Sequence, residues 1–211
     1  MSGSFRVVES DCLLDHRKHD HIVFYLKCNG VRHFIIYNDP RRFGFLLIDK
    51  TDHLSQHPML KKLGVEPMAN SFNGCYLAEH FLNKKTSLKN ALLDQSIIAG
   101  LGNIYVCEAL WRSSLSPKRL AGTLVNKSAG PSKACLRLVA SIRDVIVEAI
   151  NAGGSSIQNH RKADGGLGYF QHQFSVYDRQ GLDCMRQGCK GAINRIVQSG
   201  RASFYCTKCG K

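Results

Sequence analysis

Two closely spaced cysteine pairs near the C-terminus decide the fold of this region: Cys184-Met185-Arg186-Gln187-Gly188-Cys189 and Cys206-Thr207-Lys208-Cys209. Four cysteines at such spacing can bring four thiolates to one tetrahedral Zn²⁺ ion, and all-sulfur coordination is typical of structural zinc sites. Two disulfides are the alternative, but they need an oxidising compartment, and no secretory signal opens the sequence. We therefore predict one structural Zn²⁺ bound by Cys184, Cys189, Cys206 and Cys209.

The segment between the two pairs predicts a β-hairpin. The segments Lys190–Ile193 and Gln198–Tyr205 contain two short β-rich runs that meet at the turn signal Ser199-Gly200. Arg201 follows this turn directly. We expect the zinc ion to fix the hairpin and Arg201 to act near its tip.

The charge of the chain indicates a polyanionic partner. The 211 residues carry a formal charge of +13, and four thiolates with one Zn²⁺ change it by −4 + 2, to +11. A basic protein that neutralises phosphates releases counterions, which favours nucleic-acid binding. A membrane surface is the alternative partner, but no apolar run approaches the roughly 20 residues that span a bilayer. The other cysteines are expected to be reduced thiols: Cys12, Cys28, Cys75, Cys107 and Cys135.

The first third of the sequence predicts a β-sheet. Asn29-Gly30 between two β-rich runs is a strong hairpin signal. The sequence opens inside this sheet, and Met1-Ser2-Gly3-Ser4 leaves no room for a preceding partner strand. The expected strands are Ser4–Glu9, His21–Lys27, Val31–Tyr37 and Phe45–Ile48.

The remainder up to the cysteines is mainly helical in pattern. Gly153-Gly154 ends a long amphipathic helix that begins at Pro131, since proline favours the first turn of a helix. A polar, glycine-rich loop follows, and Gln171–Tyr177 is expected to be extended. The other expected elements are a turn at Pro58–Leu63 and helices at Gly74–Asn83, Ser87–Ile98 and Ile104–Arg112.

Gly100-Leu101-Gly102-Asn103 joins two of these helices and predicts a phosphate-binding turn. Glycines let the backbone approach a ligand closely, and the following helix presents free N–H groups at its positive end. A plain packing joint between two helices is the alternative on this signal alone. The phosphate interpretation gains from Arg201 and from a basic cluster of Lys84, Lys85 and Lys89.

A second basic site combines arginine with an aromatic ring at Arg41-Arg42-Phe43. An aromatic side chain can wedge between base steps of a duplex while an arginine hydrogen-bonds an exposed base edge. A solvated turn with one core aromatic residue is the alternative.

Taken together, these motifs resemble the formamidopyrimidine-DNA glycosylase family along the whole chain. Leu92-Leu93-Asp94, Gly100–Tyr105 and Glu108 resemble its helix–two-turn–helix core, and Cys189–Ile193 with Arg201–Cys209 is similar to its zinc finger. Further matches are Lys18–His21, Asn38–Gly44 and Asp164–Phe170.

The resemblance implies an α+β fold in three parts. Residues 1–66 would be the remainder of an N-terminal β-sandwich domain. Residues 67–180 would form the helix–two-turn–helix DNA-binding domain, with a lesion-capping loop at 153–168. Residues 181–211 would form the four-cysteine zinc-finger hairpin.

The implied function is base-excision repair of oxidised purines such as 8-oxoguanine, with glycosylase and β,δ-elimination lyase activity on a flipped-out nucleotide. The implied partner is duplex DNA containing oxidised purines or abasic sites, bound by a cytoplasmic, nucleoid-associated monomer of bacterial type. By the resemblance, Arg201 would assist the second elimination, and Met1, Arg41 and Phe43 would fill the void left by the flipped base. The residues expected to hold DNA are His19, Arg41, Lys84, Lys89, Asn103 and Arg201.

The sequence departs from the family at the reacting group. The family's nucleophile is an N-terminal proline followed by a catalytic glutamate, and a further lysine assists elimination. This sequence instead begins at a methionine that the family places well inside its first domain. All five prolines are internal, and an internal proline nitrogen is an amide without a basic lone pair. We therefore expect little or no strand cleavage from these 211 residues. The alternative to a glycosylase whose sequence begins late is a zinc-dependent damaged-DNA-binding protein without catalysis.

Overall fold

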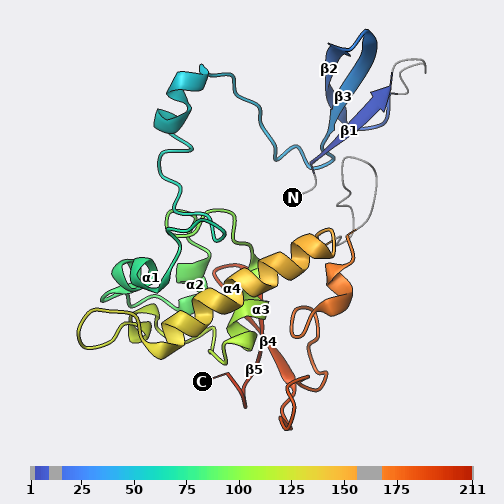
Figure 1. The fold of residues 1–211 in the computed structure, drawn as a ribbon. Coiled ribbons are helices and arrows are strands. Elements are labelled where there is room, and N and C mark those ends of the chain that lie inside the picture. Colours follow the sequence, from blue (N-terminus) through green and yellow to red (C-terminus); the bar gives the residue numbers. More distant parts are fainter. Residues whose placement is uncertain (1–2, 10–15, 156–167, 211) are drawn as a thin grey trace. The chain divides into compact units, whose positions relative to one another are not determined.

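The computed structural model describes residues 3–9, 16–155 and 168–210, which fall into two compact units (Figure 1). The first unit takes residues 1–50 and 149–173, and the second takes 51–148 and 174–211. Met1 and residues 156–167, which are most of the expected lesion-capping loop, lie outside the described residues.

The first unit contains the predicted antiparallel sheet, with strands β1 (Ser4–Glu9), β2 (Asp20–Cys28) and β3 (Val31–Asn38) in the order β1-β3-β2. Asn29 and Gly30 have φ values of 51° and 82°, as a tight hairpin turn requires. The hairpin predicted from Asn-Gly is therefore confirmed.

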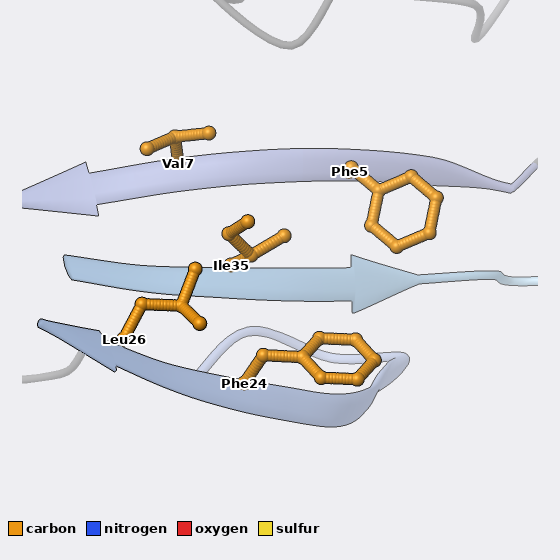
Figure 2. Close-up of a pocket in the computed structure, with 5 residues that line it drawn as sticks. All are labelled: Phe5, Val7, Phe24, Leu26 and Ile35. Carbon is orange, nitrogen blue, oxygen red and sulfur yellow. The ribbon is translucent and has the colours of Figure 1, made fainter. Parts of the chain in front are cut away.

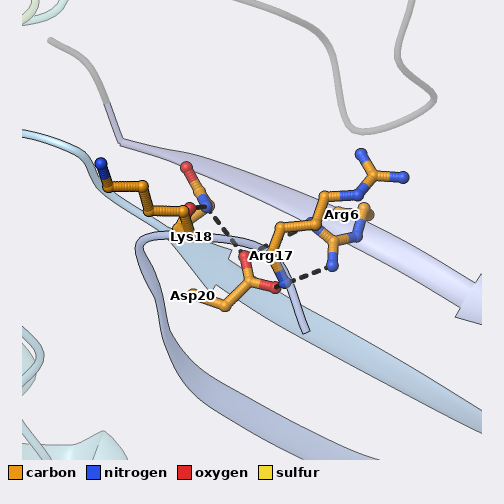
Figure 3. Close-up of polar contacts among 5 residues, drawn as sticks. Arg6, Arg17, Lys18 and Asp20 are labelled. Carbon is orange, nitrogen blue, oxygen red and sulfur yellow. Dashed lines mark hydrogen bonds and ion pairs between the residues drawn. The ribbon is translucent and has the colours of Figure 1, made fainter. Parts of the chain in front are cut away.

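An ionic network ties the three strands at one end of the sheet (Figure 3). Asp20 Oδ2 accepts a hydrogen bond from Arg6 Nη2 at 2.8 Å, and Asp20 Oδ1 accepts one from Asn38 Nδ2 at 2.8 Å. Burial alone would raise the pKa of Asp20, but the hydrogen bonds from Arg6, Asn38 and the Arg17 backbone lower it to about 2. Arg6, Asp20 and Asn38 thus link β1, β2 and β3.

One face of this sheet is apolar and exposed (Figure 2). Four of the residues on it are 39–52% exposed, and together with the less exposed Ile35 they line a shallow hollow of about 480 Å³. β1 and β2 are both edge strands. The lining residues are Phe5, Val7, Phe24, Leu26 and Ile35.

The predictions of extended structure are wrong for two segments. Residues 45–48 form no strand and are exposed, because no neighbouring strand among the described residues takes up their backbone hydrogen bonds. Residues 171–177 are not extended either: η3 (Phe170–Gln173) is a 3₁₀ turn, followed by bends. The side chain of Phe170 is fully buried.

The second unit holds the helices α1 (Gly74–Phe81), α2 (Leu88–Leu92) and α3 (Asn103–Arg112), and most of α4 (Lys133–Asn151). Polar residues cap three of them: Asn73, Ser87 and Ser132 accept hydrogen bonds from backbone N–H groups three residues later. η1 (Thr51–Gln56) and η2 (Ala121–Leu124) are 3₁₀ turns. No helix in the described parts of the chain has the length and hydropathy needed to cross a membrane.

α2 is much shorter than the predicted helix at 87–98. It stops at Leu92, and Asp94 starts a turn instead, because its carboxylate accepts hydrogen bonds from Ser96 N and Ser96 Oγ. The backbone oxygen of Asp94 also accepts from Ile97 and Ile98. The chain therefore reaches Gly100 through two turns rather than through a continuous helix.

The predicted zinc hairpin is confirmed as β4 (Ile193–Gln198) and β5 (Arg201–Cys206). Ser199 and Gly200 form the turn with φ values of 46° and 75°. Arg201 is the first residue of β5, beside the turn, and its side chain is exposed. The chain thus has the expected α+β fold, with a helix–two-turn–helix region and a four-cysteine hairpin.

Candidate nucleic-acid interface and metal centre

The four predicted ligands meet at one point in the second unit. The Sγ atoms of Cys184, Cys189, Cys206 and Cys209 all lie within 4.8 Å of one another. Cys184 Sγ is 3.6 Å from Cys209 Sγ, and Cys189 Sγ is 3.7 Å from Cys206 Sγ. Zn–S bonds of about 2.3 Å place tetrahedral sulfur ligands about 3.8 Å apart. The cluster therefore fits one structural Zn²⁺.

The ionisation of these thiols also favours a cation. Burial raises the pKa of Cys184, but hydrogen bonds from Trp111 Nε1 and the Arg186 backbone outweigh it and lower the pKa to about 7. Burial and hydrogen bonds with Cys184 and Cys206 raise the pKa of Cys209 to about 12. Thiolates this close repel one another, and a divalent cation removes that repulsion.

The backbone around the cluster is built to hold the ligands. Cys184 N donates to Gly191 O at 2.7 Å, and Ile193 N donates to Leu182 O at 2.8 Å. Trp111 Nε1 lies 3.3 Å from Cys184 Sγ, so α3 supports the metal centre directly. The eight cysteines that the structure describes form no disulfide.

The turn between α2 and α3 leaves an open approach to the N-terminus of α3. Gly100 has a φ of +77°, and Gln95 Oε1 accepts a hydrogen bond from its N–H at 2.8 Å. A side chain at Gly100 or Gly102 would meet no atom within 4 Å. Gly102 is the N-cap of α3, so Asn103 is the first helical residue rather than the cap. The first turn of a helix leaves N–H groups available to an anion.

A buried lysine joins this turn to the zinc hairpin. Lys89 Nζ donates to Ala202 O at 2.8 Å and to Ser203 Oγ at 2.6 Å, and the whole residue is inaccessible to solvent. Asn103 Nδ2 donates to the same Ala202 oxygen at 3.0 Å. Burial lowers the pKa of Lys89, and the charge of Arg201 lowers it further. Side chains from α2 and α3 therefore hold the strand that begins with Arg201.

Further hydrogen bonds brace the hairpin against the helices. Ser203 Oγ donates to Gln198 Oε1 at 2.7 Å, and Gln198 Nε2 donates to Pro117 O at 3.2 Å. Asn90 Nδ2 donates to Ser199 Oγ at 2.8 Å. These contacts fix both sides of the turn that precedes Arg201.

The predicted DNA-binding residues fall into two groups. Lys84, Lys89, Asn103 and Arg201 belong to the second unit, where Lys89 and Asn103 converge on Ala202 O. Lys84 is partly exposed, whereas the ammonium group of Lys89 is enclosed in the joint.

The other group, His19, Arg41 and Phe43, belongs to the first unit. Asp39 joins them: Asp39 N donates to His19 O at 3.0 Å, and Asp39 Oδ1 accepts from Arg41 N at 3.2 Å. The Arg41 guanidinium lies 4.5 Å from the centre of the Phe43 ring, a stacked cation–π arrangement.

Sequence reasoning missed several residues that organise these sites. Gln95, Ser203 and Gln198 are ordinary polar residues in the sequence, and only the fold shows which backbone groups they bind. Trp111 carried a usable signal, because a lone tryptophan in a predicted helix needs a partner for its N–H group.

Comparisons with known proteins agree with this description. A model of the formamidopyrimidine-DNA glycosylase H2TH domain matches residues 63–161. A formamidopyrimidine-DNA glycosylase of Rhizobium etli is 54% identical over 221 residues, which cover all of this chain and 75% of that protein.

Solved structures give the same picture. The Lactococcus lactis Fpg in complex with DNA containing an abasic site matches with a TM-score of 0.83 and 31% identity, over all of this chain and 72% of that one. The MutM (Fpg) protein of Thermus thermophilus matches with a TM-score of 0.80 and 34% identity, over all of this chain and 73% of that one. The chain thus spans about three quarters of the length of these relatives.

Proposed function

Because this chain belongs to the formamidopyrimidine-DNA glycosylase family, we propose that it acts in base-excision repair on duplex DNA containing oxidised purines or abasic sites. Its place of action is the cytoplasm of a bacterial cell, at the nucleoid. The full activity of the family, removal of an oxidised base followed by β,δ-elimination, belongs to this proposal. The net charge of +13 supports a partner rich in phosphate.

One observation carries the DNA-binding part of the proposal. Lys89 from α2 and Asn103 from α3 both donate to Ala202 O, the carbonyl group next to Arg201. The N-terminus of α3 and the exposed Arg201 are therefore parts of one rigid arrangement. A helix N-terminus and a neighbouring guanidinium suit adjacent phosphates of a DNA backbone.

Fluorescence anisotropy tests this proposal with a labelled duplex that carries a tetrahydrofuran abasic analogue. We expect tighter binding than to the undamaged duplex of the same sequence, and affinity that falls steeply with salt because each neutralised phosphate releases counterions. Equal affinity for the two duplexes at every salt concentration would contradict the proposal.

Two arginines in the hairpin provide a matched pair of variants. Arg201→Ala is expected to weaken binding roughly 10- to 150-fold, since a charge-assisted phosphate contact contributes roughly 1.5–3 kcal/mol. Arg195→Ala removes the same charge from an exposed position in β4. Its effect should be below about threefold, the range of an exposed charge acting at a distance. Similar losses in both variants would show that only net charge matters.

A second candidate function is damaged-DNA binding without catalysis. No proline in this sequence is followed by glutamate, and all five prolines are internal. Their nitrogens are amides and cannot attack a sugar carbon. The two candidates therefore differ in one step, the formation of a Schiff base between a protein amine and the abasic sugar.

A further inference from the structure

A buried carboxylate lies at the centre of the basic turn formed by residues 39–44. Asp39 is only 2% exposed, although the neighbouring Arg41 and Phe43 are exposed. Its Oδ2 atom accepts from the Tyr37 hydroxyl at 3.0 Å and from Gly44 N at 2.8 Å, and its Oδ1 atom accepts from Arg41 N at 3.2 Å. A carboxylate that accepts several such hydrogen bonds is well suited to fix a turn.

The backbone of Asp39 is held as firmly as its side chain. Asp39 O accepts from His21 Nε2 at 2.9 Å, which requires this ring nitrogen to carry the hydrogen, and from Arg42 N at 3.3 Å. Arg42 has a φ of +55°, a left-handed conformation that a non-glycine residue adopts only when its surroundings hold it there. The Asp39 hydrogen bonds on both sides of Arg42 supply that constraint.

Tyr37 closes the turn from the sheet side. A Cβ atom at Gly44 would lie 1.7 Å from the Tyr37 hydroxyl oxygen, so only glycine fits while Tyr37 reaches Asp39. Burial raises the pKa of Tyr37, and its hydrogen bond to Asp39 raises it further, so the hydroxyl stays protonated and able to donate. The last residue of the turn is thereby packed against β3.

This arrangement determines how the turn presents its exposed side chains. Phe43 is 60% exposed, and its ring stacks with the guanidinium of Arg41 at 4.5 Å from the ring centre. Both residues sit between the two backbone N–H groups that Asp39 holds, at positions 41 and 44. Without the carboxylate, the backbone carrying Arg41 and Phe43 loses these two anchors.

We propose that Asp39 is a positioning residue, whose carboxylate, oriented by Tyr37, fixes the 39–44 turn so that Arg41 and Phe43 are presented together to damaged duplex DNA. Asp39 itself does not touch the DNA. The inference rests on the proposed function, because it assigns Arg41 and Phe43 to that DNA surface.

The test compares four proteins: the unsubstituted chain, Asp39→Asn, Phe43→Ala and the double variant. The readout is the preference for the abasic-analogue duplex, measured as the ratio of the two dissociation constants by anisotropy. Asparagine keeps the size of the side chain but presents an N–H₂ group to donors, so we expect Asp39→Asn to lower the preference about tenfold. If Asp39 acts through the turn, the loss in the double variant is smaller than the product of the two single losses, because Phe43→Ala has already removed part of what the turn presents.

Two controls separate positioning from general damage. Asp49→Asn changes an exposed aspartate of the same unit outside the turn and should leave the preference unchanged. Amide hydrogen exchange should be faster at Gly44 in Asp39→Asn than in the unsubstituted chain, with the strands β1–β3 unchanged. Tyr37→Phe keeps the ring and removes only the hydroxyl, and it should lower the preference about threefold. If Asp39→Asn does not fold, this variant tests the role of the Asp39 carboxylate in its place.

An unchanged preference in Asp39→Asn, or effects of Asp39→Asn and Phe43→Ala that multiply in the double variant, would overturn the inference. If the unsubstituted chain showed no preference for the abasic duplex, the proposed function would fail instead. In that case, unchanged amide exchange at Gly44 in Asp39→Asn also overturns the role of Asp39 in the turn. Faster exchange there supports a role of Asp39 in fixing the turn, but not in DNA binding.

Discussion

At the scale of one residue, Glu108 joins α3 to the segment that leads into the zinc cluster. Its two carboxylate oxygens accept hydrogen bonds of 2.9–3.0 Å from the backbone N–H groups of residues 175–177, and the residue is fully buried. Glutamine presents an N–H₂ group to these donors and leaves at least one buried amide unpaired. We expect Glu108→Gln to lower the free energy of unfolding by about 1–3 kcal/mol in urea denaturation.

Glu148→Gln is the matched control for that measurement. Glu148 pairs with Arg112 at 2.5 Å, but its side chain is 44% exposed. Because water still reaches Glu148, losing this partly exposed bidentate pair should lower the free energy of unfolding by only about 1 kcal/mol. Equal losses of free energy of unfolding in the two variants would show that the burial of Glu108 does not increase what its hydrogen bonds contribute to stability.

Position 191 needs a glycine because a side chain there would collide with the metal centre, and not because of its backbone conformation. A Cβ atom there would lie 2.7 Å from Cys206 Sγ and 3.1 Å from Lys208 Cβ. We expect Gly191→Ala to weaken zinc binding at least about tenfold in competition with a chromophoric chelator, because displacing one sulfur degrades the tetrahedral geometry.

Gly200→Ala in the same hairpin separates this collision from backbone strain. Gly200 has a φ of +75°, but a Cβ atom there meets nothing within 4 Å. Alanine should therefore cost about 1 kcal/mol of stability and leave zinc affinity unchanged. A loss of zinc in both variants would point to hairpin strain as the common cause.

Single residues also show what the sequence can and cannot predict. The four predicted zinc ligands come together in the fold, because their spacing alone carries the geometry. The burial of Lys89 could not be foreseen, because its partners Ala202 and Ser203 lie more than 110 positions away in the sequence. From the sequence it is one cation in a basic cluster.

At the scale of elements, the Asp20 network makes the stability of the first sheet depend on pH. The folded pKa of Asp20 is about 2, below the ordinary 3.8, so the stabilisation is fully present above about pH 4 and is lost as pH falls towards 2. The shift corresponds to about 2 kcal/mol. Urea denaturation followed by circular dichroism should show this loss, and Asp20→Asn should remove it.

The difference between the two proteins is the informative quantity, because other carboxyl groups also titrate in this range. It should shrink between pH 4 and pH 2. The side chain of Arg6 is only 22% exposed. If the difference in free energy of unfolding stayed constant over that interval, protonation of Asp20 would not weaken its pair with Arg6.

Elements are predicted well where a turn signal ends them, and poorly where a side-chain contact or the lack of a partner strand decides the outcome. Both hairpins form at their Asn-Gly and Ser-Gly turns, which have the positive φ values that these turns need. α2 was predicted too long because the side-chain contacts of Asp94 compete with helix continuation. Residues 45–48 are apolar enough for a strand but have no partner strand among the described residues.

At the scale of the whole molecule, the sheet of the first unit leaves one apolar face exposed in the part of the chain that the structure describes. Phe5, Val7 and Phe24 on its apolar face are 39–52% exposed. A sheet with one apolar face is normally covered by a second layer. This agrees with the fact that the chain spans only about three quarters of its relatives. The resemblance to the family could predict this difference in length, whereas composition and periodicity alone could not.

The positions of the prolines lead to the prediction about chemistry. With every proline nitrogen in an amide bond, the sequence offers no evident nucleophile for the abasic sugar. The DNA-binding elements of the second unit are nevertheless assembled, with Lys89 and Asn103 holding the strand of Arg201. We therefore expect binding without covalent chemistry.

Borohydride trapping on a duplex with an abasic site measures this directly, because reduction converts a Schiff base into a stable protein–DNA adduct. We expect no adduct from the 211-residue chain, under conditions where anisotropy shows salt-sensitive retention of the duplex. The longer Rhizobium etli relative serves as the positive control. An adduct from the 211-residue chain would contradict the prediction. Some other amine, such as the α-amino group of Met1, must then attack the sugar. Peptide mapping of the adduct would identify that amine.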